Sequence, residues 1–254
     1  MEEEQIPLTS LESCMELTAF NLLGFTLQYE LSYTNILKML DLAGIARRSK
    51  DRKESDPLVM AGGPCAFNVE PLAEFFDFVV LGEGEEIIHE ILAVVKLSRA
   101  RGDTRSEVLV EIAKLDGIYV PAFYQPVYAT DGAFQALTPI YKDVKPQIEK
   151  RVVADFNALP FPTEFVVPYV EVVHDRVMAE IMRGCTRGCR FCQAGMIYRP
   201  LREREPDVLK QQIAQLVEST GYEEISLSSL SSGDYSQIDT LLKDLMTDYQ
   251  SCGI

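Results

Sequence analysis

The chain has 254 residues, of which 47% are hydrophobic, and its formal net charge at pH 7 is −15. This composition is typical of a globular protein with a sizeable core, and the acidic balance argues against nonspecific binding of nucleic acid by the chain as a whole. No run approaches the roughly eighteen apolar residues of a membrane span, and the acidic N-terminus lacks the apolar region of a signal peptide.

The first part of the chain alternates predicted strands with predicted helices. Apolar runs predict strands at 17–27, 57–60 and 78–81, and helical spacing predicts helices at 31–42, after Asn68, at 87–95 and at 101–115. Gly44 is expected to stop the first helix, Asn68 to cap the second, and Pro71 to lie near the start of that second helix. This alternation predicts an α/β fold with a doubly wound parallel sheet.

Two glycine-rich turns, Gly62-Gly63-Pro64 and Gly82-Glu83-Gly84, follow predicted strands. Ligands of doubly wound sheets bind beyond the carboxyl ends of the strands, where these turns fall. Tight turns between a strand and a helix need glycine in any case, so the turns alone do not establish a binding site.

The middle of the chain changes character. Residues 118–121 and 123–134, with a turn signal at Asp131-Gly132, predict a small β-hairpin. Residues 137–168 are rich in proline and charge without steady periodicity, which indicates a linker. Residues 166–173 and 177–182 then either pair as a second hairpin or lead into the next domain.

Three of the six cysteines, Cys185, Cys189 and Cys192, lie within eight residues at the spacing C-x3-C-x2-C. They follow a predicted buried strand, and Gly184 and Gly188 supply the backbone freedom that a tight loop needs. Three soft thiolates on one loop suit an iron–sulfur cluster or zinc. Ordinary buried thiols are the third interpretation.

The number of ligands favours the cluster. A structural zinc site needs four protein ligands, and the candidates for a fourth are Cys14, Cys65, Cys252, His89 and His174. A cubane cluster held by three cysteines leaves one iron without a protein ligand, which is the open position that catalysis requires. Cysteines grouped in this way also suit a reducing compartment, so we expect a cytoplasmic protein.

The segment after the cysteines has the pattern of two β/α units. A helix at 206–220 carries its apolar side chains at the spacing of one helix face, and Gly221 follows its end. The elements expected next are a strand at 224–230, a turn at 231–234 and a helix at 238–249.

The cysteine spacing, with Phe191 just before the last cysteine, resembles the radical S-adenosylmethionine (SAM) superfamily. The resemblance implies a 4Fe-4S cluster on the three cysteines, with SAM chelated at the open iron and cleaved reductively to a 5′-deoxyadenosyl radical. It also implies that Phe191 lines the part of the site that holds the adenine of SAM. Ser232, Gly233 and Asp234 then occupy the turn that contacts the SAM amino group. The usual Gly-Glu pair is absent there, and a serine-rich turn that merely caps the next helix stays an alternative.

The two glycine turns resemble those of the cobalamin-binding type of Rossmann domain that precedes many radical SAM barrels. The Asp-x-His-x-x-Gly loop of that type, which supplies the lower ligand of cobalt, is absent, and Cys65 stands where a histidine often follows Gly-Gly-Pro. The resemblance therefore implies a B12-binding-like domain. The departures argue against cobalamin and favour a degenerate or substrate-binding role.

Four longer runs look like one uncharacterised bacterial radical SAM family, namely residues 24–35, 61–68, 183–200 and 226–236. This resemblance implies three regions, an incomplete B12-binding-like Rossmann domain at 1–122, a hairpin and linker at 123–168, and the truncated start of a partial TIM-type barrel at 169–254. A radical SAM barrel has about six β/α units, so we expect the chain to be a fragment that is inactive by itself.

Two other functions stay open. A non-catalytic electron-transfer or iron-sensing module would take a fourth thiolate from Cys65 or Cys252. A zinc-stabilised nucleic-acid-binding module would use the six arginines between Arg183 and Arg204 and would lose affinity steeply with salt. Those arginines pair either with an anionic ligand or with the chain's own acids.

The expected partners follow from the leading interpretation. They are SAM, an electron donor such as flavodoxin or ferredoxin, and a substrate that the sequence does not identify, with RNA or the ribosome as one class. No membrane partner is expected.

Overall fold

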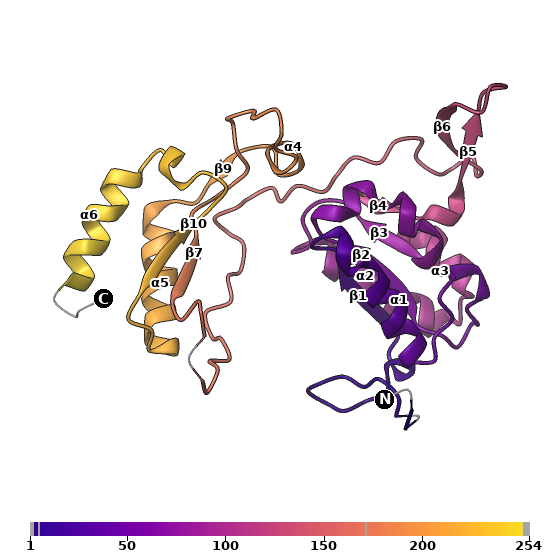
Figure 1. Cartoon of the computed structure of the whole chain (residues 1–254), viewed down its shortest axis with the longest axis horizontal. Coiled ribbons are helices and arrows are strands. Elements are labelled where there is room, and N and C mark those ends of the chain that lie inside the picture. Colours follow the sequence, from indigo (N-terminus) through magenta and orange to yellow (C-terminus); the bar gives the residue numbers. More distant parts are fainter. Residues whose placement is uncertain (1–2, 5, 171, 251–254) are drawn as a thin grey trace. The chain divides into compact units, whose positions relative to one another are not determined.

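The computed structural model describes residues 3–4, 6–170 and 172–250. The chain divides into two compact units, Met1–Val153 and Ala154–Ile254 (Figure 1). The domain boundaries expected at residues 122 and 168 stay predictions. Among the described residues, no helix combines the length and the apolar composition needed to cross a lipid bilayer.

The first unit is built on a four-stranded sheet in the order β1-β2-β3-β4. Its strands are β1 (Leu22–Thr26), β2 (Leu58–Gly62), β3 (Phe78–Val80) and β4 (Ile118–Tyr119). The first three are parallel, as predicted, and β4 runs antiparallel at the edge. The prediction that placed Ile118 and Tyr119 in the hairpin is wrong. Both side chains are buried, and the main sheet offers a core on each face whereas a two-stranded hairpin does not.

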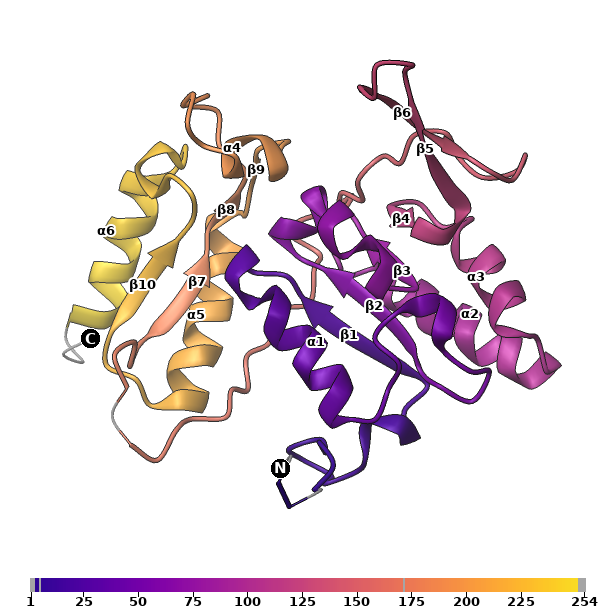
Figure 2. The ribbon, with the colours of Figure 1, turned by 45° about the vertical axis from the view of Figure 1, so that its right-hand side comes forward.

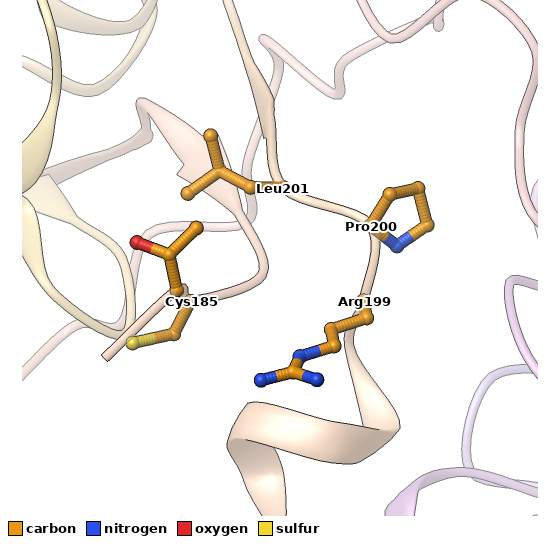
Figure 3. Close-up of a pocket in the computed structure, with 5 residues that line it drawn as sticks. Cys185, Arg199, Pro200 and Leu201 are labelled. Carbon is orange, nitrogen blue, oxygen red and sulfur yellow. The ribbon is translucent and has the colours of Figure 1, made fainter. Parts of the chain in front are cut away.

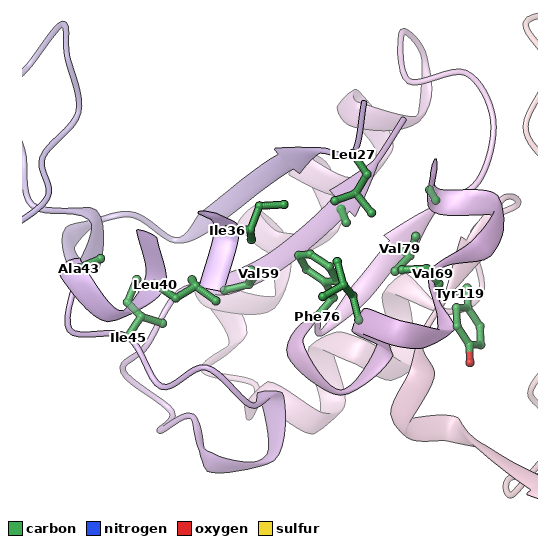
Figure 4. Packing of buried hydrophobic residues seen from close by; sticks show 13 residues of the cluster. Leu27, Ile36, Leu40, Ala43, Ile45, Val59, Val69, Phe76, Val79 and Tyr119 are labelled. Atoms are coloured by element: carbon green, nitrogen blue, oxygen red, sulfur yellow. The ribbon is translucent and has the colours of Figure 1, made fainter. Parts of the chain in front are cut away.

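Helices cover both faces of this sheet (Figure 2). They are α1 (Tyr33–Leu42), α2 (Ile87–Arg101) and α3 (Arg105–Ile112). On one face, Ile36 and Leu40 of α1 pack with Val59 and Val79 of the sheet (Figure 4). On the other face, side chains of α2 and α3 pack with Phe78 and Val80. Alternation along β3 produces this division, because successive side chains of a strand point to opposite faces.

Short 3-10 helices fill much of the remaining first unit. They are η1 (Leu17–Ala19), η2 (Glu30–Ser32), η3 (Ser49–Asp51), η4 (Pro64–Asn68), η5 (Glu70–Phe75) and η6 (Pro121–Phe123). Two predictions are wrong here, because residues 17–19 are not strand and Asn68 ends η4 instead of capping a helix. Pro71 lies near the start of η5 as predicted, and its missing N–H and bulky ring prevent one α-helix from running through this stretch.

A hairpin of β5 (Tyr124–Tyr128) and β6 (Phe134–Pro139) follows the sheet. The predicted turn is confirmed, since the Asp131 carboxylate accepts a hydrogen bond from the N–H of Ala133 at 3.0 Å and Gly132 has φ +84°. The prediction that the linker begins at residue 137 is wrong, because residues 137–139 belong to β6; residues 140–153 contain neither a helix nor a strand.

The second unit contains two parallel strands, β7 (Val177–Glu180) and β10 (Ile225–Ser228). The helices α5 (Pro206–Thr220) and α6 (Ile238–Tyr249) pack on the sheet, and Ala179, Leu209 and Leu241 meet in their shared core. α5 has the predicted bounds and ends before Gly221, whose φ is +69°. The two predicted β/α units are thus present.

The remaining elements of this unit surround the cysteines. They are β8 (Met182–Arg183), α4 (Ala194–Ile197), β9 (Arg202–Glu203) and η7 (Ser232–Asp234). The described residues of 166–173 form no strand, so the second-hairpin alternative is wrong and β7 pairs with β10 instead. Because β7 and β10 are parallel, the cysteine loop and η7 follow the same, carboxyl edge of the sheet, where barrel enzymes place their active sites.

Candidate metal centre

The cysteine loop connects β8 to β9, which pair as a short antiparallel ribbon. Gly184 lies where the two ends of the loop meet, with φ +93°. A Cβ added there would lie 2.8 Å from the carbonyl oxygens of both Tyr198 and Pro200. Glycine is therefore required at this position, and the predicted need for backbone freedom is confirmed.

Backbone hydrogen bonds shape the loop around the three thiols. The N–H of Cys192 donates to the carbonyl of Cys189 at 3.0 Å, and the N–H of Arg187 donates to Sγ of Cys185 at 3.4 Å. Cys189 is exposed, while Cys185 and Cys192 are half-buried. Hydrogen bonds to sulfur are one of the means by which proteins tune iron–sulfur clusters.

The donor set of the loop fits an iron–sulfur cluster. Within the described part of the chain, no three His, Cys, Asp or Glu side chains are grouped around a position for a single metal ion. Three thiolates on one loop are the soft donors that iron–sulfur clusters take, and each thiolate of a cubane binds a different iron. Of the suggested fourth ligands, Cys14, Cys65 and His89 belong to the first unit, His174 belongs to the second, and Cys252 lies outside the described residues.

A pocket of about 500 Å³ lies beside Cys185. Its other lining residues are Thr186, Arg199, Pro200 and Leu201, and the Arg199 side chain extends toward the Cys185 side of the pocket (Figure 3). This volume falls in the range of small-molecule sites. Sequence analysis did not single out Arg199, because no local pattern indicates that the end of the loop returns to its start.

One ion pair joins the cysteine loop to η7. Nε of Arg187 donates to Oδ2 of Asp234 at 2.5 Å, and a second guanidinium N–H donates to Oδ1. The Ser231 hydroxyl also donates to Oδ2 of Asp234, at 2.7 Å. These donors, Arg187 first, hold the pKa of the Asp234 carboxyl below its ordinary value. A predicted cofactor residue is thereby fixed against the predicted metal loop.

The other two residues of η7 differ in their surroundings. The Ser232 hydroxyl donates to the carbonyl of Leu227 at 3.3 Å, so it supports the turn itself. A Cβ added to Gly233 would meet nothing within 4 Å, so the backbone of this turn borders open space. Phe191 is 92% exposed, and its ring is available to a ligand.

At least three of the six arginines around the cysteines contact other groups of the protein. Arg183 makes two hydrogen bonds to the Glu180 carboxylate, at 3.0 and 2.8 Å. Arg204 is buried over the ring of Phe156, with 4.2 Å between its Cζ and the ring centroid. With Arg187 on Asp234, these contacts favour the interpretation that the arginines pair with this chain's own groups. Phe156 was not identified from the sequence, since it lies in the predicted linker.

Other parts of the chain lie close to one glycine in each glycine turn of the first unit, Gly63 and Gly82. At Gly63 (φ +99°), an added Cβ would lie 3.0 Å from the carbonyl oxygen of Leu27, which accepts from the N–H of Cys65 at 3.0 Å. Burial, and after it the charge of Glu30, raises the pKa of the Cys65 thiol. At Gly82, residues further along the chain occupy the space next to the turn.

Comparison with known proteins gives two family matches. The model of the radical SAM proteins' N-terminal region matches residues 1–121, and the model of the radical SAM superfamily matches residues 179–252. The chain is also 28% identical over 231 residues to an uncharacterized protein of Methanocaldococcus jannaschii, an alignment that covers 90% of this chain and 42% of that protein.

Two solved structures of TsrM, a radical S-adenosylmethionine methyltransferase from Kitasatospora setae, have a similar fold. One contains cobalamin and a 4Fe-4S cluster, and the other contains tryptophan substrate and the SAM analog aza-SAM. Each aligns with a TM-score of 0.54 at 15% identity over 91% of this chain, and over 42% and 41% of the respective TsrM chains. The chain thus spans less than half the length of the proteins it matches.

The likeness to TsrM confirms the α/β architecture, with a partial Rossmann-like unit followed by the first β/α units of a radical SAM core. The two family models cover the two units in the same order. The chain belongs to the radical SAM superfamily.

Proposed function

We propose that the protein containing this chain is a radical SAM enzyme, with a 4Fe-4S cluster held by Cys185, Cys189 and Cys192. The observation that carries this proposal is the Arg187–Asp234 ion pair. It ties the three-cysteine loop to the turn after β10, at the carboxyl edge of two parallel strands. When bound, the cluster would supply the electron for reductive cleavage of SAM.

Different residues of this chain would bind different parts of SAM. The exposed ring of Phe191 offers a face for adenine. Ser232, Gly233 and Asp234 would meet the amino group, Asp234 as the acceptor and Gly233 by leaving space for the ligand. The pocket beside Cys185 would take part of the ligand. An electron donor such as flavodoxin or ferredoxin is part of the proposal, and the substrate, with RNA among its classes, stays open.

The second glycine turn of the first unit does not fit cobalamin. A Cβ added to Gly82 would lie 2.1 Å from the carbonyl oxygen of Arg151, so the protein already occupies the space next to Gly82. His89 is exposed on α2 and lacks the Asp-x-His-x-x-Gly context that supplies the lower ligand of cobalt. The proposal therefore includes no step through cobalamin, and it assigns to the first unit the degenerate or substrate-binding role predicted from the sequence.

The test uses the full-length protein, purified and reconstituted without oxygen. Iron and sulfide are quantified, and the protein is incubated with SAM and dithionite before 5′-deoxyadenosine is measured. We expect about four irons per chain and deoxyadenosine formation, both lost in Cys189→Ala. Cys65→Ala is the matched control and should retain both.

Three results would contradict the proposal in different ways. Loss of iron in Cys65→Ala would support a four-thiolate electron-transfer or sensing module. A loaded cluster that does not cleave SAM would support the same class. Zinc in place of iron, retained under anaerobic handling, would support a zinc-stabilised module.

A further inference from the structure

The two partners of the Arg187–Asp234 pair are held very differently. The Asp234 side chain is 19% exposed, and Ser231 donates a third hydrogen bond to it at 2.7 Å. The Arg187 side chain is 64% exposed. The carboxylate is therefore a fixed acceptor, whereas the guanidinium can leave for solvent without opening the core.

Replacing Arg187 by another cation at Asp234 costs little free energy. Ion pairs in contact with solvent contribute little net free energy, because water and salt screen them and the long arginine side chain loses entropy when it is held. A cation that reaches Asp234 from a bound ligand, with its freedom already restricted, can replace such a partner. An ammonium group is the matching chemistry, since it carries one charge and several donors in a small volume.

The location of Arg187 brings this exchange to the metal loop. Arg187 directly follows Cys185 and Thr186, two residues that line the pocket, and its own N–H donates to Sγ of Cys185. Arg187 also lies two residues from Cys185 and two residues from Cys189 in the sequence. A released Arg187 would thus still lie beside thiolates whose negative charge it can offset.

We propose that Arg187 is a stand-in for the ammonium group of SAM: it occupies Asp234 until the ligand binds, and the ligand's ammonium then displaces it toward the metal loop. This inference rests on the proposed function. It makes Arg187 a positioning residue that competes with SAM, so its removal should strengthen SAM binding. A residue that merely braced the loop would have the opposite effect when removed.

The test measures the affinity of the reconstituted full-length protein for SAM by equilibrium dialysis. Arg187→Gln should tighten binding by about 1.4- to 5-fold, the range expected when an exposed ion pair no longer competes. Asp234→Asn should weaken binding by about tenfold or more. In the double variant, Arg187→Gln should no longer tighten binding relative to Asp234→Asn alone, because the contested carboxylate is gone.

Arg190→Gln is the matched control. It removes the same charge from the same loop, and Arg190 makes no ion pair with any residue in the described ranges. Its affinity for SAM should equal that of the wild type. Equal tightening in both variants would overturn the exchange and indicate a general charge effect. Weaker or unchanged binding in Arg187→Gln would overturn it too.

A second readout follows the cluster directly. The electron paramagnetic resonance spectrum of the reduced cluster should shift on addition of SAM at a lower SAM concentration in Arg187→Gln than in the wild type. If the wild type binds neither iron nor SAM, the proposed function itself fails. If the wild type binds both and the order of affinities is reversed, the exchange alone fails.

Discussion

Arg151 lies across the turn that follows β3 and pairs with Gly82 in a parallel β-bridge. The N–H of Arg151 donates to the carbonyl of Leu81 at 2.8 Å, and its own carbonyl accepts from the N–H of Glu83 at 3.1 Å. Its guanidinium reaches the carboxylate of Glu90 at 2.5 Å. A segment within the predicted linker is thus bound to the very turn that sequence analysis placed at the ligand-binding edge of the sheet.

Substituting Gly82 should detach this segment. In Gly82→Ala the new Cβ would lie 2.1 Å from the carbonyl oxygen of Arg151, and the backbone would keep a φ of +104° that alanine rarely adopts. The conformational strain alone costs about 1–3 kcal/mol, and the overlap adds to it. We expect a clear loss of unfolding free energy in urea denaturation of the full-length protein. Gly84→Ala is the control, because a Cβ there meets nothing within 4 Å, and an equal loss in both variants would contradict the steric explanation.

A buried carboxylate holds together the opposite, amino-terminal edge of the same sheet. The Asp77 side chain is fully buried and accepts from Arg52 at 2.8 Å, from Arg105 at 2.5 Å and from the N–H of Val59 at 2.6 Å. Arg52 is fully buried as well. This network anchors the start of β3 and takes no part in the proposed chemistry.

Asp77→Asn should therefore destabilise the first unit without affecting the cluster. Removing the charge leaves two guanidinium groups in or near the core without their shared counter-ion, which typically costs about 3–5 kcal/mol. The measurement is the urea midpoint together with iron content after reconstitution. Asp116→Asn, which breaks the exposed pair with Lys145, is the control and should cost a small fraction of that. Comparable losses in the two variants would show that burial of Asp77 is not the cause.

Local patterns predicted most of the elements because each element buries one face. The spacing of Leu209, Ile213 and Leu216 predicted α5 to its observed ends, and Gly221 supplied the stop. The parallel sheet followed from alternation of strands and helices. The prediction that Asn68 caps a helix was wrong because two prolines seven residues apart override the cap.

The contacts that build the site could not be predicted from local sequence patterns. Arg187 and Asp234 are separated by 47 positions, and Arg151 and Glu90 by 61. A charge pair of that separation forms only because the topology brings two loops to one edge of a sheet. From the sequence alone, any of the chain's many acidic residues could have been the partner of either arginine. Cysteine spacing identified the metal loop because its three ligands are local.

Tyr235, next to Asp234, should make the second unit sensitive to alkali. Burial, followed by the charges of Glu203 and Glu205, raises the pKa of Tyr235 to about 12, compared with about 10 in an unfolded chain. A raised folded-state pKa means that the stabilising contribution is complete below pH 10 and is lost as pH rises through about 12. Its hydroxyl donates to the buried carbonyl of Arg204 at 2.7 Å.

Comparison with Tyr235→Phe isolates this group. Near neutral pH the variant should lose about 1–3 kcal/mol, because the Arg204 carbonyl is left without its donor. Urea unfolding at steps between about pH 10 and 12 should show the difference between the two proteins shrinking, since ionisation removes the same bond from the wild type. Other tyrosines titrate in both proteins and cancel in the difference. A difference that stays constant across this range would contradict the assignment.

Substituting Phe191 should test SAM binding without changing the stability of the fold. Its side chain is 92% exposed, so Phe191→Ala removes almost no buried surface and should change the unfolding free energy by less than about 0.5 kcal/mol. If its ring covers adenine, SAM affinity should fall by about 2- to 13-fold, the value of one aromatic contact. Iron content should not change. Phe134→Ala, which truncates a ring that is 61% exposed on the hairpin of the first unit, should leave SAM affinity and iron content unchanged. Unaltered SAM affinity in Phe191→Ala, with the cluster intact, would remove Phe191 from the proposed site while leaving the three cysteines in place.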